Sequence, residues 1–300
     1  MGKATDLMSR RTFVALSGGV IGSMAAAGCA QKPAEQAASA PEPAKTAPVD
    51  PYAGFRMGMQ TWCVREFKST DDVIKSLHEL GLKYVEIAPT IHLPEDTPPD
   101  EIKATVERYK SEGITIDSCG VSRMPNDEAS CRKVFEYAKL LGVLAIDVAP
   151  EYEALPLVDR LTEEYGLPVA IHNHGPEDKL YAKPEMYRQY LAKTSTRVGL
   201  CLDTGHSQRS GVNPLRVIDE FPDRIRGMHI KDMVPVVEGG HWEDAIVGRG
   251  LLYLPCLLGK LKEIGFNGFF SLEYESDPSN PLPAMKECLA EIRKACAALA

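Results

Sequence analysis

Four successive apolar segments in the second half of the chain each end in side chains of the types that bind metal ions or move protons. These side chains are His172 and His174, Asp203 and His206, His229 and Lys231, and Glu273. Two imidazoles and two carboxylates suit a divalent cation, and the absence of thiolates from the set argues against a structural zinc site of the cysteine type. The expected metal ligands are His172, Asp203, His229 and Glu273. The expected ion is Mn²⁺, with Mg²⁺, Co²⁺ or Zn²⁺ as alternatives.

A cation held in this way favours proton abstraction next to a carbonyl group. A hydroxy-ketone or aldose would chelate the ion, and the ion would stabilise the charge that develops on the ene-diolate oxygen. We expect Glu273 or His174 to act as the base, because both should overhang the bound carbon. Lys231 is expected to supply positive charge to the oxyanion. The alternative for Lys231 is a simple ion pair with Asp232 or Glu275.

Two residues in the first half of the chain are expected to contact the substrate. Trp62 follows the first apolar segment and is predicted to stack on the C–H face of a sugar; the alternative is that its ring only plugs the mouth of the fold. Glu86 lies in the second apolar segment and is predicted to reach the same rim and bind hydroxyl groups. If Glu86 is instead an exposed loop charge, its removal should leave activity unchanged.

The elements that must position these residues alternate along the chain from residue 56 onward. The predicted strands are Arg56–Thr61, Tyr84–Ala88, Thr115–Cys119, Leu144–Ala149, Val169–Asn173, Val198–Leu202, Ile225–Ile230 and Phe269–Leu272. Helical patterns at Asp71–Leu80, Glu101–Glu112, Glu128–Leu141 and Leu254–Ile264 are each followed by glycine, the usual C-cap. Eight strand–helix units in about 250 residues predict a (β/α)8 TIM barrel, whose chemistry lies at the carboxyl ends of the strands.

Two features refine this fold prediction. No G-x-G-x-x-G follows the first predicted strand, which disfavours a doubly wound dinucleotide-binding sheet. The interval between His229 and Phe269 is longer than the others, so we expect an insertion at the rim of the active site.

The composition excludes some function classes. The 300 residues carry 34 Lys and Arg against 42 Asp and Glu, and the formal net charge is −8. An acidic protein of this kind is not expected to bind nucleic acid. The hydrophobic fraction of 44% is ordinary for a folded globular protein.

The N-terminal segment is predicted to direct export. Residues 9–16, Ser-Arg-Arg-Thr-Phe-Val-Ala-Leu, resemble a twin-arginine signal, and the small residues before Cys29 resemble a lipobox. The apolar stretch at 13–27 is too short to span a hydrocarbon core of roughly 30 Å. We therefore expect a signal peptide at 1–29, an Ala/Pro-rich disordered linker at 30–51 and the barrel at 52–300. The expected location is periplasmic, with membrane contact only through a lipid on Cys29.

Five motifs carry a resemblance to a known family. They are V-A-I-H-N-H-G at 169–175, C-L-D-T-G-H at 201–206, G-M-H-I-K-D at 227–232, G-R-G at 248–250 and N-G-F-F-S-L-E-Y-E at 267–275. With them the chain resembles the sugar phosphate isomerase/epimerase, or xylose isomerase-like, TIM-barrel superfamily. The resemblance implies that Asp203, His229 and Glu273 bind the metal ion. It implies that His206 is a substrate-binding or metal-adjacent residue.

One departure from the family pattern concerns the reaction. Ketose epimerases of the family usually have Glu where this chain has His172, and they use two opposed carboxylates to move a proton between the faces of a carbon. The H-x-H variant resembles inosose dehydratase-like members. We expect a metal-dependent isomerase or epimerase acting on an unphosphorylated sugar or keto-sugar. The alternatives are a keto-sugar or inosose dehydratase and a non-catalytic sugar-binding lipoprotein.

Overall fold

The structure is a computed structural model that describes residues 50–236 and 241–299. The predicted signal peptide, the lipobox cysteine and most of the predicted linker lie outside the described residues. Asp50, placed at the end of the linker by the sequence analysis, begins an ordered turn: its carboxylate accepts hydrogen bonds from the backbone N–H groups of Tyr52 and Gly54. None of the helices in the described ranges has the length and hydropathy needed to cross a bilayer.

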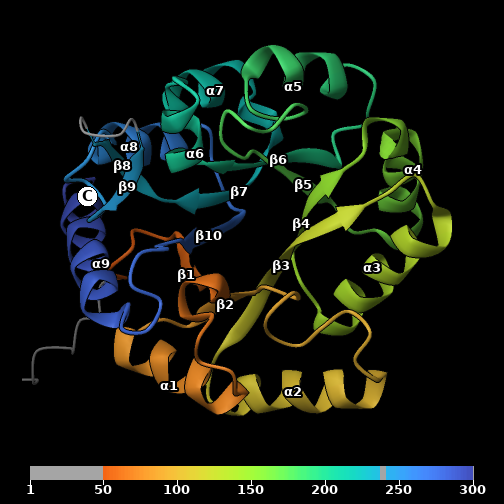
Figure 1. The fold of residues 1–300 in the computed structure, drawn as a ribbon, viewed down its shortest axis with the longest axis horizontal. Helices are drawn as coiled ribbons and strands as arrows, with labels where there is room; N and C mark the ends of the chain where they lie inside the picture. Colours follow the sequence, from red (N-terminus) through yellow and green to blue (C-terminus); the bar gives the residue numbers. More distant parts are fainter. Residues whose placement is uncertain (1–49, 237–240, 300) are drawn as a thin grey trace, which may run out of the picture. The chain divides into compact units, whose positions relative to one another are not determined.

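Eight parallel strands close into a barrel, which confirms the predicted TIM-barrel fold (Figure 1). The strands are β1 (Arg56–Gln60), β2 (Tyr84–Ile87), β3 (Thr115–Met124), β4 (Ala145–Pro150), β5 (Val169–His172), β6 (Val198–Asp203), β7 (Ile225–Ile230) and β10 (Phe269–Leu272). Their order around the barrel is β1-β10-β7-β6-β5-β4-β3-β2. The strands β5, β6, β7 and β10 are therefore consecutive neighbours, as the predicted site requires.

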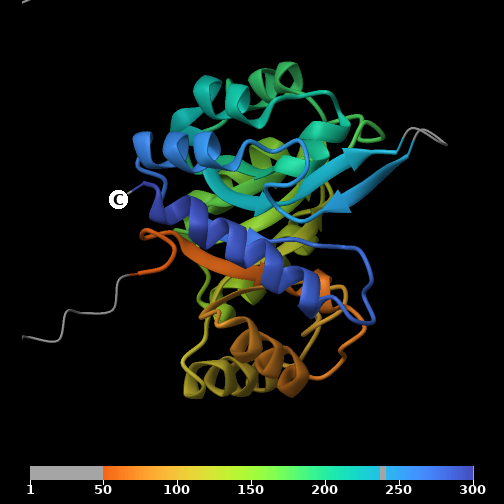
Figure 2. The same ribbon diagram turned by 90° about the vertical axis from the view of Figure 1, so that its left-hand side faces the viewer.

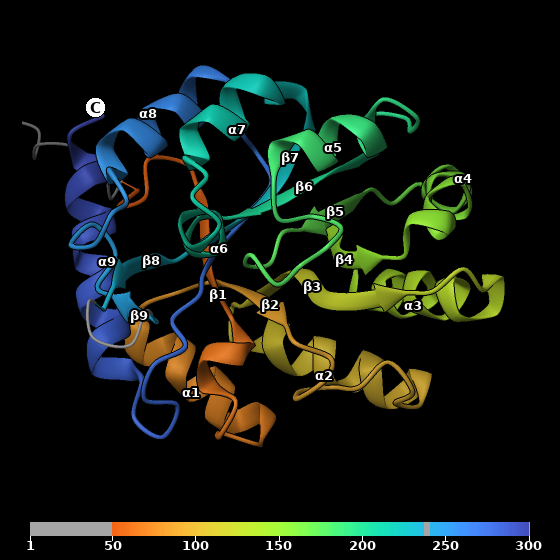
Figure 3. The ribbon, with the colours of Figure 1, turned by 45° about the horizontal axis from the view of Figure 1, so that its top comes forward.

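Helices surround the barrel, one or more after most strands (Figure 3). They are α1 (Thr70–Leu80), α2 (Pro99–Ser111), α3 (Glu128–Leu141), α4 (Leu155–Tyr165), α5 (Pro184–Leu191), α6 (Thr204–Arg209), α7 (Pro214–Glu220), α8 (Leu254–Glu263) and α9 (Leu282–Ala297), with short 3₁₀ turns η1 (Thr61–Val64), η2 (Tyr152–Ala154) and η3 (Pro222–Arg224). Gly81 and Gly142 follow α1 and α3 with φ of 70° and 74°. This left-handed conformation is the C-cap that the glycine pattern predicts.

The predicted insertion after β7 is a two-stranded antiparallel hairpin, β8 (Asp232–Pro235) and β9 (Trp242–Ala245). The hairpin projects from the barrel beyond the carboxyl end of β7 (Figure 2). Its base is fixed by Asp232, whose carboxylate accepts hydrogen bonds from the backbone N–H groups of Gly248, Gly250 and Leu252 at 2.8–2.9 Å. The G-R-G motif thus provides donors for a buried carboxylate.

The floor of the barrel is a small apolar layer of Ala145, Ala170, Cys201 and Phe269, all buried. Gly227 lies directly against the Phe269 ring. An added Cβ at residue 227 would lie 2.0 Å from Cζ of that ring and 2.4 Å from its Cε atoms. Only glycine therefore fits beside Phe269 without a shift of the ring.

Replacing Gly227 with alanine should destabilise the barrel by about 3 kcal/mol, because overpacking forces a fully buried ring out of place. Urea denaturation measures the change in the free energy of unfolding. The matched control is Gly259→Ala in α8, where the nearest atom to a new Cβ is 4.0 Å away. Helix propensity favours this control variant by about 1 kcal/mol. Equal stability of the two variants would contradict the packing argument.

Candidate metal and substrate site

The carboxyl ends of β5, β6, β7 and β10 bring together the side chains predicted as metal ligands. One ligand atom each from Asp203, His229 and Glu273 lies within 4.8 Å of the other two. The ring centroid of His172 lies 4.8 Å from that of His229. All four side chains are buried, with exposed residue fractions between 0% and 8%. Closure of the barrel thus produces the convergence that the sequence analysis expects.

Asp203 is held by the first turn of α6, for which it is the N-cap. Its Oδ1 accepts a hydrogen bond from the backbone N–H of His206 at 2.6 Å. Its Oδ2 is buried and has no hydrogen-bond partner; it lies 3.7 Å from Nζ of Lys231 and 4.0 Å from Nδ1 of His229. One carboxylate oxygen is therefore fixed by the backbone, and the other faces positively charged or ligating groups.

Lys231 is buried among carboxylates. Its Nζ lies 3.1 Å from Oε2 of Glu273 and contacts Oε1 of Glu275. Burial disfavours the ammonium, but the charges of Glu273 and Asp203 outweigh burial and raise the pKa of Lys231. Burial alone would raise the pKa of Glu273, but Lys231 and His229 hold it well below its usual value. Glu273 is therefore ionised. Lys231 does not pair with Asp232, whose carboxylate instead accepts backbone hydrogen bonds at the base of the hairpin.

Asp147, on β4, is a site residue that the sequence analysis did not identify. Its Oδ2 lies 3.2 Å from Nδ1 of His172 and 3.4 Å from Nε2 of His229. A carboxylate beside an imidazole orients the ring and leaves the other ring nitrogen free to bind a metal ion. The sequence held a signal: Asp147 is a charge in an apolar strand, and it shares the inward-facing side of β4 with Ala145.

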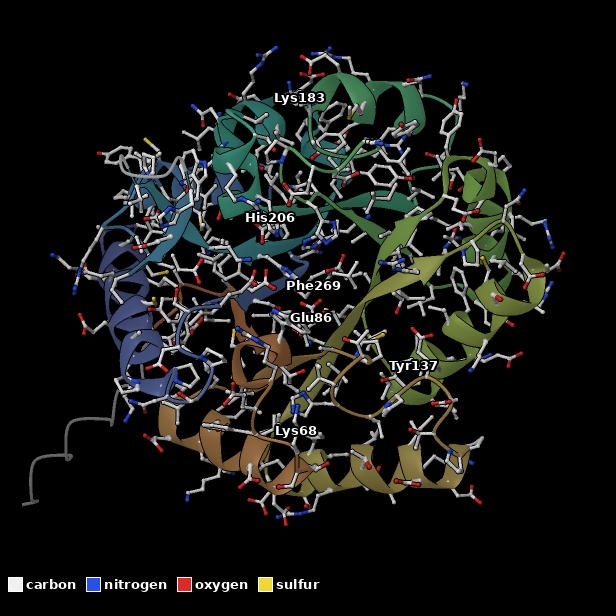
Figure 4. The ribbon with its side chains drawn as sticks, viewed as in Figure 1. Lys68, Glu86, Tyr137, Lys183, His206 and Phe269 are labelled. Atoms are coloured by element: carbon white, nitrogen blue, oxygen red, sulfur yellow. The ribbon has the colours of Figure 1, made fainter. Side chains whose placement is uncertain are left out.

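Glu86 lies deep inside the barrel and not at its rim. Its side chain has no exposed surface; Oε2 lies 2.9 Å from Nε2 of His229 and accepts a hydrogen bond from Ser271 Oγ at 2.7 Å. In the view of Figure 4, the labels of Glu86 and Phe269 lie near the centre of the ring of strands. The structure therefore places Glu86 neither at the rim, where it was predicted to bind hydroxyl groups, nor in the exposed loop of the alternative. Its carboxylate contacts His229, a predicted metal ligand.

The residues present fit a divalent cation. Among the buried carboxylate oxygens without hydrogen-bond partners, three lie at this site: Glu86 Oε1, Asp147 Oδ1 and Asp203 Oδ2. An ionised carboxylate that is buried without compensation is costly, and a bound cation would supply that compensation. Burial also lowers the pKa of His172 to about 3, so its ring is neutral and retains a lone pair for an ion. Asp203, His229 and Glu273 would hold the ion, with His172 beside them.

The sequence comparison agrees with the barrel fold. Residues 74–295 match the family model described as xylose isomerase-like TIM barrel. The chain belongs to the xylose isomerase-like TIM barrel family.

Two relatives of this xylose isomerase-like barrel carry a functional name. It is 30% identical over 140 residues to the rhizopine catabolism protein MocC of Rhizobium meliloti, with 42% of each chain covered. It is 25% identical over 133 residues to the inosose dehydratase of Lacticaseibacillus casei, with 40% of this chain and 44% of the relative covered. The chain thus matches less than half the length of these two relatives.

Solved structures show the same fold. The IolI protein crystallised with a bound zinc atom superposes on 80% of this chain and 98% of its own, with a TM-score of 0.65 and 19% sequence identity. At that identity the similarity establishes the fold of the xylose isomerase-like barrel and nothing finer.

Three further predicted site residues lie above the ligand cluster. The side chain of His174 is 41% exposed, and its ring centroid lies 4.6 Å from that of His172 and 5.4 Å from that of His206. Burial lowers the pKa of His174 to about 4, so the ring is neutral and can accept a proton. Trp62, in η1, is half-buried and donates a hydrogen bond from Nε1 to Oε2 of Glu275 at 3.3 Å. The structure thus brings His174 and His206 to the site and links Trp62 to it through Glu275.

Replacing Asp147 with asparagine should weaken Mn²⁺ binding by about 10- to 100-fold, because the carboxylate that orients His172 is lost. Isothermal titration calorimetry measures the affinity. The matched control is Asp117→Asn on β3: Asp117 is equally buried, but its ion pair is with Arg56, at 3.7 Å. Equal losses in the two variants would show that the effect is general destabilisation and not orientation of the imidazole.

Mn²⁺ affinity should rise with pH between about pH 6 and pH 8. Burial raises the pKa of Asp147 to about 7, and burial also raises the pKa of Asp203. Below these pKa values the carboxyl groups hold protons that must leave before an ion binds, so lower pH weakens binding. Calorimetry in buffers of different ionisation enthalpy should detect proton release on binding. Affinity independent of pH across this range would contradict the assignment.

Proposed function

We propose that this protein is a divalent-metal-dependent isomerase or epimerase that removes the proton next to the carbonyl group of an unphosphorylated sugar or cyclic polyol ketone. The observation that carries the proposal is the buried group of Asp203, His229 and Glu273, with an unpartnered Asp203 oxygen and the Lys231 ammonium beside it. When bound, a divalent ion supplies Lewis-acid stabilisation of charge on the carbonyl oxygen.

The chain's own residues supply the proton transfer. Glu273 is ionised, and its carboxylate is the proposed acceptor of the substrate proton. The Lys231 ammonium offsets negative charge that develops nearby. His174 is neutral and more exposed than the ligand cluster, so it is placed to take a proton from the substrate or, after taking one up from water, to return it.

Pairing of the cationic groups at the site supports an uncharged substrate. Lys231 contacts Glu273 and Glu275, and Arg209 forms a bidentate pair with Glu177. A phosphosugar would have to draw one of these cations away from its carboxylate. An unphosphorylated substrate leaves both pairs intact.

Dehydration is the second candidate reaction. It uses the same proton abstraction but expels a hydroxyl group from the neighbouring carbon. Two observations favour it: the sequence similarity to an inosose dehydratase, and the solvent-exposed His174 beside His172 in the H-x-H motif. His174 would first take up a proton from water and then deliver that proton to the departing hydroxyl group.

The test is hydrogen exchange in D₂O. The purified protein is loaded with Mn²⁺ and incubated with a panel of keto-sugars and inososes, and the products are analysed by NMR after removal of the ion. Deuterium at the carbon next to the carbonyl, in a product of unchanged composition, supports isomerisation or epimerisation. Loss of water supports dehydration. Saturable binding without exchange across the panel would overturn the enzymatic proposal in favour of a sugar-binding protein.

We also propose that the protein is exported by the twin-arginine route and anchored by a lipid on Cys29. The support is the Arg10-Arg11 pair and the small residues before the cysteine. Fractionation of the native host tests both steps. Replacing both arginines with lysine should block export, and Cys29→Ala should release the exported protein from the membrane. Unchanged fractionation of both variants would contradict the proposal.

A further inference from the structure

We propose that Arg209 fixes the tautomer of His206, so that this ring donates a hydrogen bond from Nε2–H to a substrate oxygen and does not bind the metal ion. The identity of the acceptor rests on the proposed function. The tautomer rests on the geometry of the protein alone.

The contact between Arg209 and His206 has only one possible direction. Nη1 of Arg209 lies 2.9 Å from Nδ1 of His206. A guanidinium group has five N–H donors, no acceptor and a charge that is not lost in proteins. Nδ1 must therefore accept this hydrogen bond with its lone pair. The proton of the neutral imidazole is then on Nε2.

Arg209 is itself held in place by two features of the loop after β5. Its Nη2 donates to both carboxylate oxygens of Glu177, at 3.1 Å and 3.0 Å. The guanidinium also passes over Gly175, where an added Cβ would lie 2.7 Å from Cζ and Nη1. The side chains of Arg209 and Glu177 are 25% and 58% exposed, so the guanidinium is better shielded from water than its carboxylate partner. Because Nη1 bonds to His206 and Nη2 bonds to Glu177, the two contacts together orient the guanidinium.

The tautomer decides what His206 can do at the site. The geometry alone would permit a metal site of His172, Asp203 and His206, because one ligand atom of each lies within 4.8 Å of the others. A ring nitrogen that carries a proton has no lone pair for a metal ion. Nδ1 is occupied by Arg209, and Nε2 carries the proton, so His206 is excluded as a ligand.

The Nε2–H group is available to a bound molecule. Within residues 50–236 and 241–299, the structure contains no protein acceptor for it. The ring lies 5.4 Å from that of His174 and 6.0 Å from that of His172, measured between centroids, so its donor belongs to the same site. The backbone N–H of His206 is bonded to Asp203 Oδ1, which fixes the position of the residue. The ligand chemistry that fits is a hydroxyl or carbonyl oxygen of a polyol.

The tautomer can be read directly by NMR. We would label the histidines of the full-length protein with ¹⁵N and record long-range ¹H–¹⁵N correlations without metal and with Mg²⁺, a diamagnetic ion; loss of a signal in His206→Asn assigns the ring. The expected pattern is the Nε2–H tautomer in both states. In Arg209→Met, which keeps length but has no donor, the single tautomer should be lost, and Arg209→Lys should restore it in part.

Metal binding provides a second measurement. His206→Ala should retain Mn²⁺ affinity within about threefold, whereas His172→Ala should lose more than tenfold. If turnover is present, Arg209→Met should lower kcat/KM about tenfold, mainly through KM. An Nδ1–H tautomer in the wild-type protein, or a loss of Mn²⁺ affinity in His206→Ala equal to that in His172→Ala, would overturn the proposal. The NMR result stands whether or not hydrogen exchange occurs, so failure of the two proposals is distinguishable.

Discussion

Replacing Glu273 with glutamine should lower the rate of hydrogen exchange at the substrate carbon by about 10³-fold, within the range that general base catalysis supplies. The amide has nearly the same shape but cannot accept the substrate proton. It also removes the negative charge that lies 3.1 Å from Nζ of Lys231 and 3.1 Å from Nδ1 of His229. Deuterium incorporation in D₂O, measured by NMR at saturating Mn²⁺, gives the rate.

Two controls sharpen this result. Glu243→Gln makes the same chemical change on the exposed hairpin, where Glu243 pairs with His241, and should leave the rate unchanged. Mn²⁺ content must be measured in the Glu273→Gln protein, so that loss of the ion is separated from loss of the base. An exchange rate within tenfold of the wild-type rate, with Mn²⁺ bound, would show that another residue acts as the base. The next residue to replace would then be His174.

Replacing Asp203 with asparagine should weaken Mn²⁺ binding by more than 10²-fold and abolish exchange at low Mn²⁺ concentration. The variant loses a fully buried carboxyl oxygen, Oδ2, that has no hydrogen-bond partner and that would bind the ion once the group has lost its proton. Asparagine caps helices about as well as aspartate, so α6 should keep its first turn. Calorimetry measures the affinity, and circular dichroism with thermal unfolding checks the fold.

The effect of losing a helix N-cap on stability can be measured at a residue outside the metal site. Asn213 is the N-cap of α7 and accepts a hydrogen bond from the backbone N–H of Leu215 at 3.0 Å. Asn213→Ala should lower the free energy of unfolding by about 1 kcal/mol and leave Mn²⁺ affinity unchanged. If Asp203→Asn binds Mn²⁺ as the wild type does, the ligand assignment of this residue is wrong.

The strands could be predicted because they are buried on both faces. Each core segment is a short apolar stretch, and a glycine in the left-handed conformation ends helices such as α1 and α3. The motifs at the strand ends then placed Asp203, His229 and Glu273 on neighbouring strands. Barrel closure is the step that turns this order along the chain into proximity in space.

The direction of Glu86 could not be predicted from strand alternation. The pairing of β2 with β3 shifts register between Val85 and Glu86, and such an irregularity changes where following side chains point. The depth of a residue inside the barrel is also set by the stagger of the strands, which sequence does not reveal. The Glu86 carboxylate therefore contacts His229 inside the barrel.

The sequence leaves Asp232 and Glu275 open as alternative partners of Lys231 and predicts no partner for Arg209. A basic side chain can pair with a sequence neighbour or with a partner from another loop, and only the fold decides. Lys231 pairs with Glu273 and Glu275 from β10 and the loop that follows it, and Arg209 pairs with Glu177 from the loop after β5. Long, flexible side chains of this kind are the least predictable part of a site.

The anchoring of the hairpin base by Asp232 separates two kinds of evolutionary change. The junction between β7 and β8 carries His229, Lys231 and Asp232, so the candidate site and the base of the insertion are fixed by the same few residues. Asp244 on β9 also belongs to the base of the insertion, because its carboxylate accepts hydrogen bonds from the backbone N–H groups of Glu275 and Ser276. Changes farther along the insertion leave these contacts in place. The outer part of the insertion can therefore vary among related proteins while the residues at the carboxyl end of β7 stay in place.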